Sequence, residues 1–133
     1  MTRFELTLEV PLAKPLPSLA NSRMHWRALA AEKAQQRHRL ALHLRARGGA
    51  FLREWQVMRG NEALRLGVAW TRVASRELDS DNLQGAVKAY RDELAKWLGM
   101  DDRSKRYEWT YAHAKGAPAL VVRLEVLTSE VVR

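Results

Sequence analysis

The sequence predicts an α+β fold, in which one domain holds a mixed four-stranded sheet and two main helices in the order β-α-β-α-β-β. Three observations lead to this prediction. The chain has 133 residues, of which 47% are hydrophobic, and this is the size of one ordinary domain, so residues 1–133 are expected to share a single core. Four short segments alternate apolar and polar residues, as half-buried strands do. Two longer segments have the composition or the apolar spacing of helices.

The first strand and the first helix are predicted in the amino-terminal part of the chain. Apolar side chains alternate with polar ones over residues 4–10, and prolines prevent regular structure in the segment that follows. Residues 22–47 are rich in Ala, Leu, Gln and Arg and contain no Pro or Gly, so they are predicted to form a long helix that ends at Gly48 and Gly49. The segment 50–60 is ambiguous, and a short helical continuation is one interpretation of it.

In the second half of the chain, the sequence pattern predicts a strand, a helix and two further strands. Apolar residues alternate again over residues 64–70, which gives a second strand that runs into an acidic stretch. Over residues 82–98 they recur at helical spacing, and Gly99 is a typical helix stop. Two more alternating segments, residues 107–111 and 120–126, predict the third and fourth strands.

The chain is strongly basic, with 23 Lys and Arg against 15 Asp and Glu and a formal net charge of +8. Such a surface attracts polyanions, of which nucleic acid is the commonest and anionic membrane the weaker alternative. No apolar run approaches the roughly 20 residues of a membrane span, and Glu5 and Glu9 interrupt the amino-terminal apolar residues, so no membrane partner or signal peptide is expected. The lack of cysteine excludes disulfides, thiolate metal sites and a cysteine nucleophile, and a cytoplasmic location is expected.

The first predicted helix carries most of this charge, because its basic residues are accompanied by a single acid, Glu32. They are Arg23, Arg27, Lys33, Arg37, Arg39, Arg45 and Arg47. Two interpretations are open. A run of charges is usually a solvated helix face, but the near absence of balancing Glu also favours a face that contacts phosphates.

Acidic residues are clustered in this basic chain, in two pairs. Asp79 and Asp81 are two residues apart where the second strand is expected to end, so their side chains would share one face and converge on one cation. Hard cations such as Mg²⁺ take one or two carboxylates together with phosphate oxygens and water, and such an ion polarises a phosphodiester and generates hydroxide near neutral pH. The pattern therefore indicates nuclease chemistry. The alternative is structural: Asp81 or Asn82 caps the second helix, and Asp101 and Asp102 form a polar turn.

Structural roles are favoured for three other groups of residues. Glu77 shares the predicted strand face of the first acidic pair, but a surface role is expected for it. The histidines lack metal-site spacing and are interpreted as surface or packing residues. They are His25, His38, His43 and His113. The aromatic face formed by Tyr107, Trp109 and Tyr111 is more typical of a core or a subunit interface than of base stacking.

Several motifs together resemble one known family. The motif "DSDNL" (79–83), followed by a helix and then by "DD" (101–102) with "RSKRYEW" (103–109), resembles the RusA family of Holliday-junction resolvases, especially its phage and prophage members. The segment "PLPSLANSRMHWR" (15–27) is similar to that family's amino-terminal Pro-x-Ser-x-Asn element and His-Trp pair. The resemblance covers residues 15–115, and it is specific because the motifs occur together.

The resemblance implies a homodimeric, Mg²⁺-dependent endonuclease that cuts four-way DNA junctions with symmetric nicks, with Mn²⁺ as an alternative cation. By position, Asp79, Asp81 and Asp102 would be the metal-binding carboxylates. The family's best-known members have a functional lysine where this chain has Gly85, and Lys88, one turn further on, is the predicted replacement. The predicted DNA contacts are Arg23, Arg27, Lys33, Arg37, Arg39 and Arg76. Because Gly85 departs from the family pattern, a second function stays open, in which the chain binds branched DNA but has weakened catalysis. An unrelated basic structural protein is the third alternative.

Chain geometry constrains how the two acidic pairs meet. A straight helix over residues 82–98 is roughly 25 Å long, and the few residues after it reach back at most about 14 Å. Asp102 would therefore stay roughly 10 Å or more from Asp81 within one chain. Either Gly85 marks a break that shortens or redirects the helix, or the site is shared between the two chains of a dimer, and the shared site is favoured.

Overall fold

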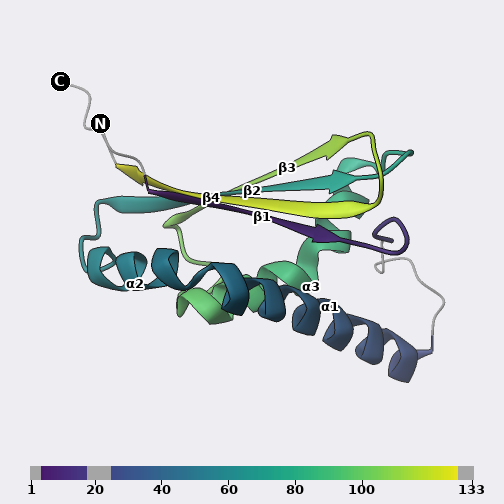
Figure 1. Cartoon of the computed structure of the whole chain (residues 1–133), viewed down its shortest axis with the longest axis horizontal. Coiled ribbons are helices and arrows are strands. Elements are labelled where there is room, and N and C mark those ends of the chain that lie inside the picture. The colour runs from purple at the N-terminus through teal and green to yellow at the C-terminus, as the bar shows by residue number, and fades with distance from the viewer. Residues whose placement is uncertain (1–3, 18–24, 129–133) are drawn as a thin grey trace.

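The computed structural model describes residues 4–17 and 25–128, and within them it has the predicted architecture of a four-stranded mixed sheet with helices packed on it (Figure 1). The elements in chain order are β1 (Glu5–Pro11), α1 (Trp26–Arg47), α2 (Gly49–Met58), β2 (Leu64–Val73), α3 (Ser80–Leu98), β3 (Tyr107–Ala114) and β4 (Ala119–Thr128). The α+β class is confirmed. The described residues form three helices, however, where the sequence predicts two main ones.

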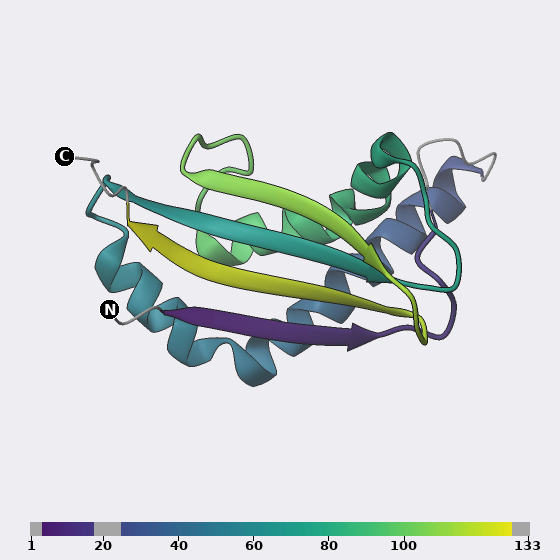
Figure 2. The same cartoon turned by 90° about the horizontal axis from the view of Figure 1, so that it is seen from above.

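The strand order in the sheet is β1-β4-β2-β3, so β1 and β3 are the edge strands. β4 pairs antiparallel with both β1 and β2, whereas β3 pairs in parallel with β2. A parallel pair needs a crossover connection, and α3 provides it between β2 and β3. Figures 1 and 2 show the helices of the described chain on a single face of the sheet, which leaves the opposite face open.

The core lies between the sheet and the helices. On β2, Leu66, Val68 and Trp70 are buried, and the residues between them are more exposed, as the alternation predicts. The helix positions that cover the sheet include Leu40 and Leu44 of α1 and Val87, Tyr90, Leu94 and Leu98 of α3. Their spacing is that of one helix face, so the apolar periodicity over residues 82–98 identifies the core face of α3 correctly.

The first predicted helix is separated from the next segment at Gly48. α1 begins at Trp26 with His25 as its N-cap, and the predicted part before residue 25 lies outside the described residues. The helix ends at Gly48, where an added Cβ would lie 2.7 Å from the ring of Trp97, too close for any side chain. Gly49 then opens α2, so the ambiguous segment belongs to a helix of its own.

The acidic stretch lies at the start of a helix. β2 ends at Val73, and α3 begins at Ser80 with Asp79 as its N-cap. The expectation that the second strand runs into the acidic stretch is therefore wrong. The side chain of Asp79 accepts the backbone N–H of Asn82, and this bond starts the helix two residues earlier than predicted. α3 ends as predicted at Gly99, whose φ of 71° is the left-handed conformation that glycine adopts without strain.

A substitution at Leu94 tests the packing of α3 against the sheet. Its side chain is 0% exposed, so Leu94→Ala removes apolar contacts and leaves a cavity. We expect the free energy of unfolding to fall by about 2–5 kcal/mol. Leu42 is 47% exposed, so Leu42→Ala is the control. The control should change the free energy of unfolding by less than about 0.5 kcal/mol. Chemical denaturation of both variants measures the difference, and equal losses would contradict the burial pattern.

Candidate functional site

Two of the predicted metal ligands, Asp79 and Asp81, lie together at the amino-terminal end of α3. The Oδ1 atom of Asp79 accepts the backbone N–H of Asn82 at 2.9 Å, and its Oδ2 lies 3.1 Å from Nδ2 of the same residue. Asp81 follows in the first turn, and both aspartates are exposed. Neither lies on a strand, so the prediction that strand alternation aligns them is wrong. The capping role predicted for Asp81 or Asn82 belongs to Asp79.

A buried arginine holds the loop that precedes Asp79. Arg72 is only 4% exposed, and its Nε donates to the carbonyl oxygen of Leu16 at 2.7 Å. Its Nη1 donates to the carbonyl oxygen of Arg76 at 2.6 Å. Burial lowers the pKa of Arg72, because removal from water disfavours the charged form. Arg72 thus ties the proline-rich segment to the loop before α3. Sequence reasoning missed this residue, although a charged side chain at a core-facing strand position was an available signal.

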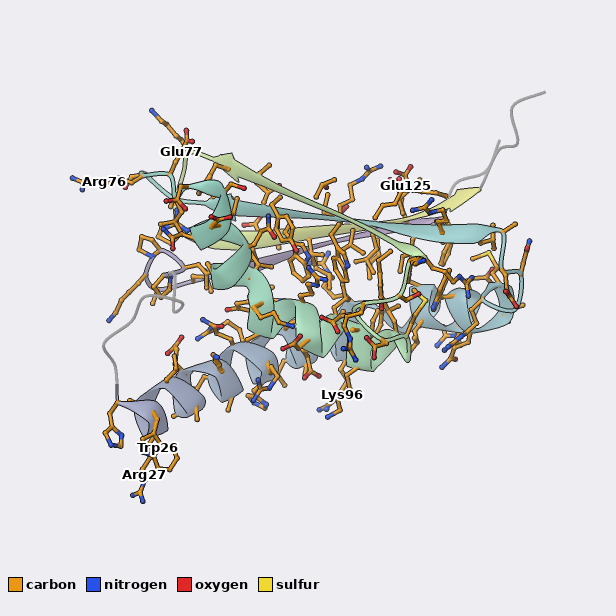
Figure 3. The ribbon with its side chains drawn as sticks, turned by 180° about the vertical axis from the view of Figure 1, so that it is seen from behind. Trp26, Arg27, Arg76, Glu77, Lys96 and Glu125 are labelled. Atoms are coloured by element: carbon orange, nitrogen blue, oxygen red, sulfur yellow. The ribbon has the colours of Figure 1, made fainter. Side chains whose placement is uncertain are left out.

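The end of β3 contacts the same loop through His113. Its Nε2 lies 2.9 Å from the backbone nitrogen of Leu78 and 3.0 Å from the carbonyl oxygen of Leu78. His113 therefore packs against the chain just before Asp79, which agrees with its interpretation as a packing residue. Arg76 and Glu77 extend from this loop away from the molecule, as Figure 3 shows. The surface role expected for Glu77 agrees with this placement.

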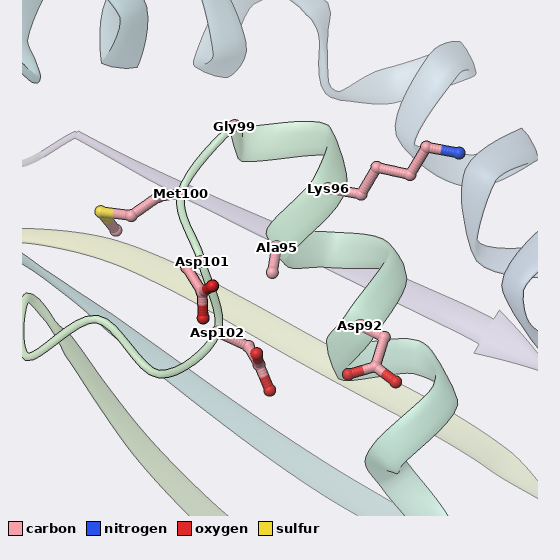
Figure 4. Close-up of a pocket in the computed structure, with 7 residues that line it drawn as sticks. All are labelled: Asp92, Ala95, Lys96, Gly99, Met100, Asp101 and Asp102. Carbon is pink, nitrogen blue, oxygen red and sulfur yellow. The ribbon is translucent and has the colours of Figure 1, made fainter.

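The third predicted ligand, Asp102, lies beside α3. Figure 4 shows its carboxylate on the side of the loop that faces Asp92, in a pocket of about 410 Å³. The Nζ atom of Lys88 binds both acids, at 2.6 Å from Oδ1 of Asp92 and 3.1 Å from Oδ2 of Asp102. The hydrogen bond with Asp92 is the main cause of a raised pKa of Lys88, so the ammonium stays charged. The structure thus brings together two predicted site residues, Lys88 and Asp102.

Asp101, the other member of the second acidic pair, forms the polar turn that the structural alternative predicts. Its Oδ1 accepts the backbone N–H of Arg103 at 2.8 Å, and its carbonyl oxygen accepts the N–H of Ser104 at 2.9 Å. The bond from the Arg103 backbone holds the pKa of the Asp101 carboxyl below its usual value. Asp101 is therefore a turn residue, and its neighbour Asp102 is the one that reaches Lys88.

The two acidic pairs do not converge on one cation within a single chain. Residues 4–17 and 25–128 contain no group of three or more His, Cys, Asp or Glu side chains that could hold a metal ion. α3 is continuous through Gly85, so no break brings Asp102 back, although the helix curves along its length (Figures 1 and 3). Lys88, the partner of Asp102, lies seven residues after Asp81, which is roughly 10 Å along a helix. This arrangement agrees with the separation expected from chain geometry.

The predicted DNA contacts on α1 differ in exposure. Arg23 lies outside the described residues. Arg27 is exposed, and its guanidinium lies 5.1 Å from the ring centre of Trp26, which is 66% exposed. Figure 3 shows both residues at the end of α1 that extends away from the sheet. Lys33 and Arg37 are half-buried, so these positive residues do not form one uniform solvated face.

Arg39 is engaged within the protein. Its Nη1 donates to the hydroxyl oxygen of Tyr90 at 2.7 Å, and the side chain of Tyr90 is buried on α3. Burial raises the pKa of Tyr90, which keeps the hydroxyl neutral. The bond joins α1 to α3. The structure therefore gives Arg39 a stabilising role, and its predicted contact with DNA stays a prediction.

Comparison with known proteins gives no family. No protein-family model matches the chain, and no curated protein is significantly similar to it. Among solved structures, a 2C-methyl-D-erythritol-2,4-cyclodiphosphate synthase aligns with 61% of this chain and 52% of its own length, at 23% identity and a TM-score of 0.33. This chain thus spans about half the length of that synthase, and a likeness this low carries no argument about fold or function. None of the described helices is long and apolar enough to cross a membrane.

Proposed function

We propose that the chain is an Mg²⁺-dependent endonuclease that resolves four-way DNA junctions in recombination and repair, as its resemblance to the RusA family implies. The observation that carries the proposal is the pair of exposed carboxylates, Asp79 and Asp81, at the start of α3 in a chain of net charge +8. A basic surface attracts DNA, and exposed acids within it are expected where a cation and a phosphate meet.

The donor set suits the proposed cation. Mg²⁺ prefers oxygen ligands and typically takes one or two carboxylates, with phosphate oxygens and water as its other ligands. Asp79 and Asp81 provide such a pair, and Mn²⁺ accepts the same donors. When bound there, the cation supplies charge stabilisation for a phosphodiester and a hydroxide near neutral pH. Asp102 of the same chain is held at Lys88 instead.

The protein's own groups around Asp79 would orient the phosphate. The amino-terminal end of a helix attracts phosphate oxygens through its N–H groups and its partial positive charge. Arg76 extends from the adjoining loop, where it would hold a flanking phosphate. Arg72 and His113 fix the backbone of this loop, which would keep Asp79 in place during the reaction.

The separation of Asp102 from the first acidic pair supports a site shared between two chains. In a two-fold dimer with the α3 helices packed antiparallel, Asp102 of each chain would approach Asp79 and Asp81 of the other. Symmetry then gives two equal sites. Two equal sites suit paired nicks in opposite strands of a junction, so the homodimer is part of the proposal.

A cleavage assay on a synthetic four-way junction tests the proposed activity. We expect cutting that requires Mg²⁺, that stops in a chelator, and that leaves linear duplex of the same sequence largely intact. A folded protein that cuts no junction with either Mg²⁺ or Mn²⁺ would not be a nuclease of this class.

A second candidate function is the binding of branched DNA without cleavage. Gly85 stands where the family's best-known members have a lysine, and Lys88, its predicted replacement, is bound to Asp92 and Asp102. Junction-selective binding without cutting in the same assay would identify this function. A protein with no preference for DNA would instead fit the basic structural protein that the sequence leaves as the third alternative.

Substitutions of Arg27 and Arg39 distinguish a contribution to DNA binding from a contribution to protein stability. Arg39→Gln removes the partner of the buried Tyr90 hydroxyl, and we expect the free energy of unfolding to fall by about 1–2 kcal/mol. Arg27 is exposed, so Arg27→Gln should change stability by less than about 0.5 kcal/mol. It should instead lower the salt-dependence slope of DNA binding by roughly one unit, because one phosphate contact is lost. Denaturation and DNA titrations at several salt concentrations measure both quantities. An unchanged slope for Arg27→Gln would show that this end of α1 is only solvated.

A further inference from the structure

The main chain of Asp102 is held by two side chains from different elements. Its carbonyl oxygen accepts a hydrogen bond from Nη2 of Arg91 on α3 at 3.2 Å and another from Nε1 of Trp109 on β3, also at 3.2 Å. Both side chains are half-buried. The position of Asp102 is therefore set by the helix and the sheet as well as by its own turn.

Arg91 is itself fixed in place. Its guanidinium lies 4.2 Å from the ring centre of Trp109, and its Nη1 donates to the hydroxyl oxygen of Tyr111 at 2.8 Å. The Nε atom is buried and has no hydrogen-bond partner within the described part of the chain. It lies 3.7 Å from Oδ2 of Asp102. Arg91 thus contacts both the carbonyl and the carboxylate of Asp102, although nothing in the sequence singled it out.

The aromatic face of β3 contacts the same loop along its length. Tyr107 is buried, and its hydroxyl donates to the carbonyl oxygen of Met100 at 2.7 Å. Burial raises the pKa of Tyr107, so this hydroxyl remains a donor. Trp109 stacks on Tyr107 with 4.4 Å between ring centres, and the guanidinium of Arg91 also lies over the Trp109 ring. These contacts fit the core role for Tyr107, which was one of the two roles favoured for the aromatic residues.

We propose that Arg91 and Trp109 are positioning residues for Asp102, which hold its backbone so that its carboxylate is presented beside Lys88. The consequence for cleavage rests on the proposed function, whereas the restraint on the loop is a property of the chain alone. Residues that orient metal-binding groups typically change metal affinity or activity 10–100-fold when replaced. The restraint is therefore large enough to measure.

Two matched tryptophan variants test the inference. Trp109→Phe removes the indole N–H that binds Asp102 and keeps an aromatic ring. Trp70→Phe is the control, because Trp70 is buried on the neighbouring strand and its Nε1 has no hydrogen-bond partner among the described residues. The amides of Arg103 and Ser104 report on the loop, since they donate to Asp101 within the turn.

In metal-free protein, hydrogen exchange at these two amides should be about five- to tenfold faster in Trp109→Phe than in the wild type, and near the wild-type rate in Trp70→Phe. With a four-way junction, Trp109→Phe should need about tenfold more Mg²⁺ for half-maximal cleavage, while junction binding in a chelator is unchanged. Arg91→Lys keeps the charge but loses the fork of donors, so it should cause the same two changes.

Loop amides that exchange no faster in Trp109→Phe and Arg91→Lys than in Trp70→Phe would overturn the inference. Variants whose loop amides exchange faster, but which need no more Mg²⁺ for half-maximal cleavage than the wild type, would also overturn the proposal that Arg91 and Trp109 position Asp102. A wild-type protein that cuts no DNA would reject the proposed function only. In that case the exchange rates would still decide whether Arg91 and Trp109 hold the loop.

Discussion

Asp81→Asn should abolish cleavage of a four-way junction, while the protein binds the junction as tightly as the wild type or more tightly. Asp81 is exposed in the first turn of α3, so the substitution removes a charge with little change in volume or packing. The change removes a proposed Mg²⁺ ligand and also a repulsion with the phosphate backbone. The loss of cleavage should exceed the 10–100-fold that is typical of residues that only support a ligand.

Glu77→Gln is the matched control for this variant. Glu77 is an exposed acid that extends from the loop before α3, and Figure 3 shows it pointing away from the molecule. Its replacement should leave cleavage near the wild-type rate. The measurements are cleavage rates with Mg²⁺ and binding in a chelator. Wild-type rates from a folded Asp81→Asn protein would exclude Asp81 from the site and remove most support for the nuclease.

A mixed dimer of Asp81→Asn and Asp102→Asn chains should regain activity that neither variant has alone. In a shared site, one of the two sites of this dimer carries both substitutions and the other carries none. The intact site should nick one strand at about the rate of a single wild-type site, because symmetry makes the two sites equal. The products should be nicked junctions, since resolution needs a cut in each of two strands.

Subunit exchange is the control for this experiment, and two affinity tags allow the mixed dimer to be purified. If each site lies within one chain, both sites of the mixed dimer carry one lesion. A purified mixed dimer that stays inactive would therefore rule out the shared arrangement. It would leave the role of Asp81 untouched, because the single variant tests that role separately.

The fold could be predicted from the sequence wherever local pattern and tertiary packing agree. Alternation identifies β2 and β4 because one face of each strand is buried and the other is not. The end of α1 at Gly48 was predicted correctly, because two glycines mark it in the sequence. The start of α3 was predicted two residues too late. The start of α3 depends on which residue of an Asp-Ser-Asp-Asn run provides the cap, and several of these residue types cap well.

The candidate site was predicted in part. The sequence placed Asp79 and Asp81 just before the second main helix, but at the end of a strand rather than at the start of the helix itself. It kept Asp102 apart from them, since chain length limits that distance. It did not predict that Arg72 or Arg91 would hold the two loops. Arg72 binds the backbone carbonyl of Leu16, 56 residues away, and Arg91 binds that of Asp102 across the turn after α3, and both partners become visible only when the tertiary structure places them.

Mapping the cuts on a four-way junction is the most direct test of the proposed junction-resolving activity. Each strand is labelled in turn at its 5′ end, and the wild-type protein is incubated with Mg²⁺. We expect nicks at symmetric positions in two opposing strands, with nicked linear duplexes as products and the same linear duplex uncut. A folded wild-type protein that leaves all four strands intact with Mg²⁺ and with Mn²⁺, or that cuts linear duplex equally well, would contradict it.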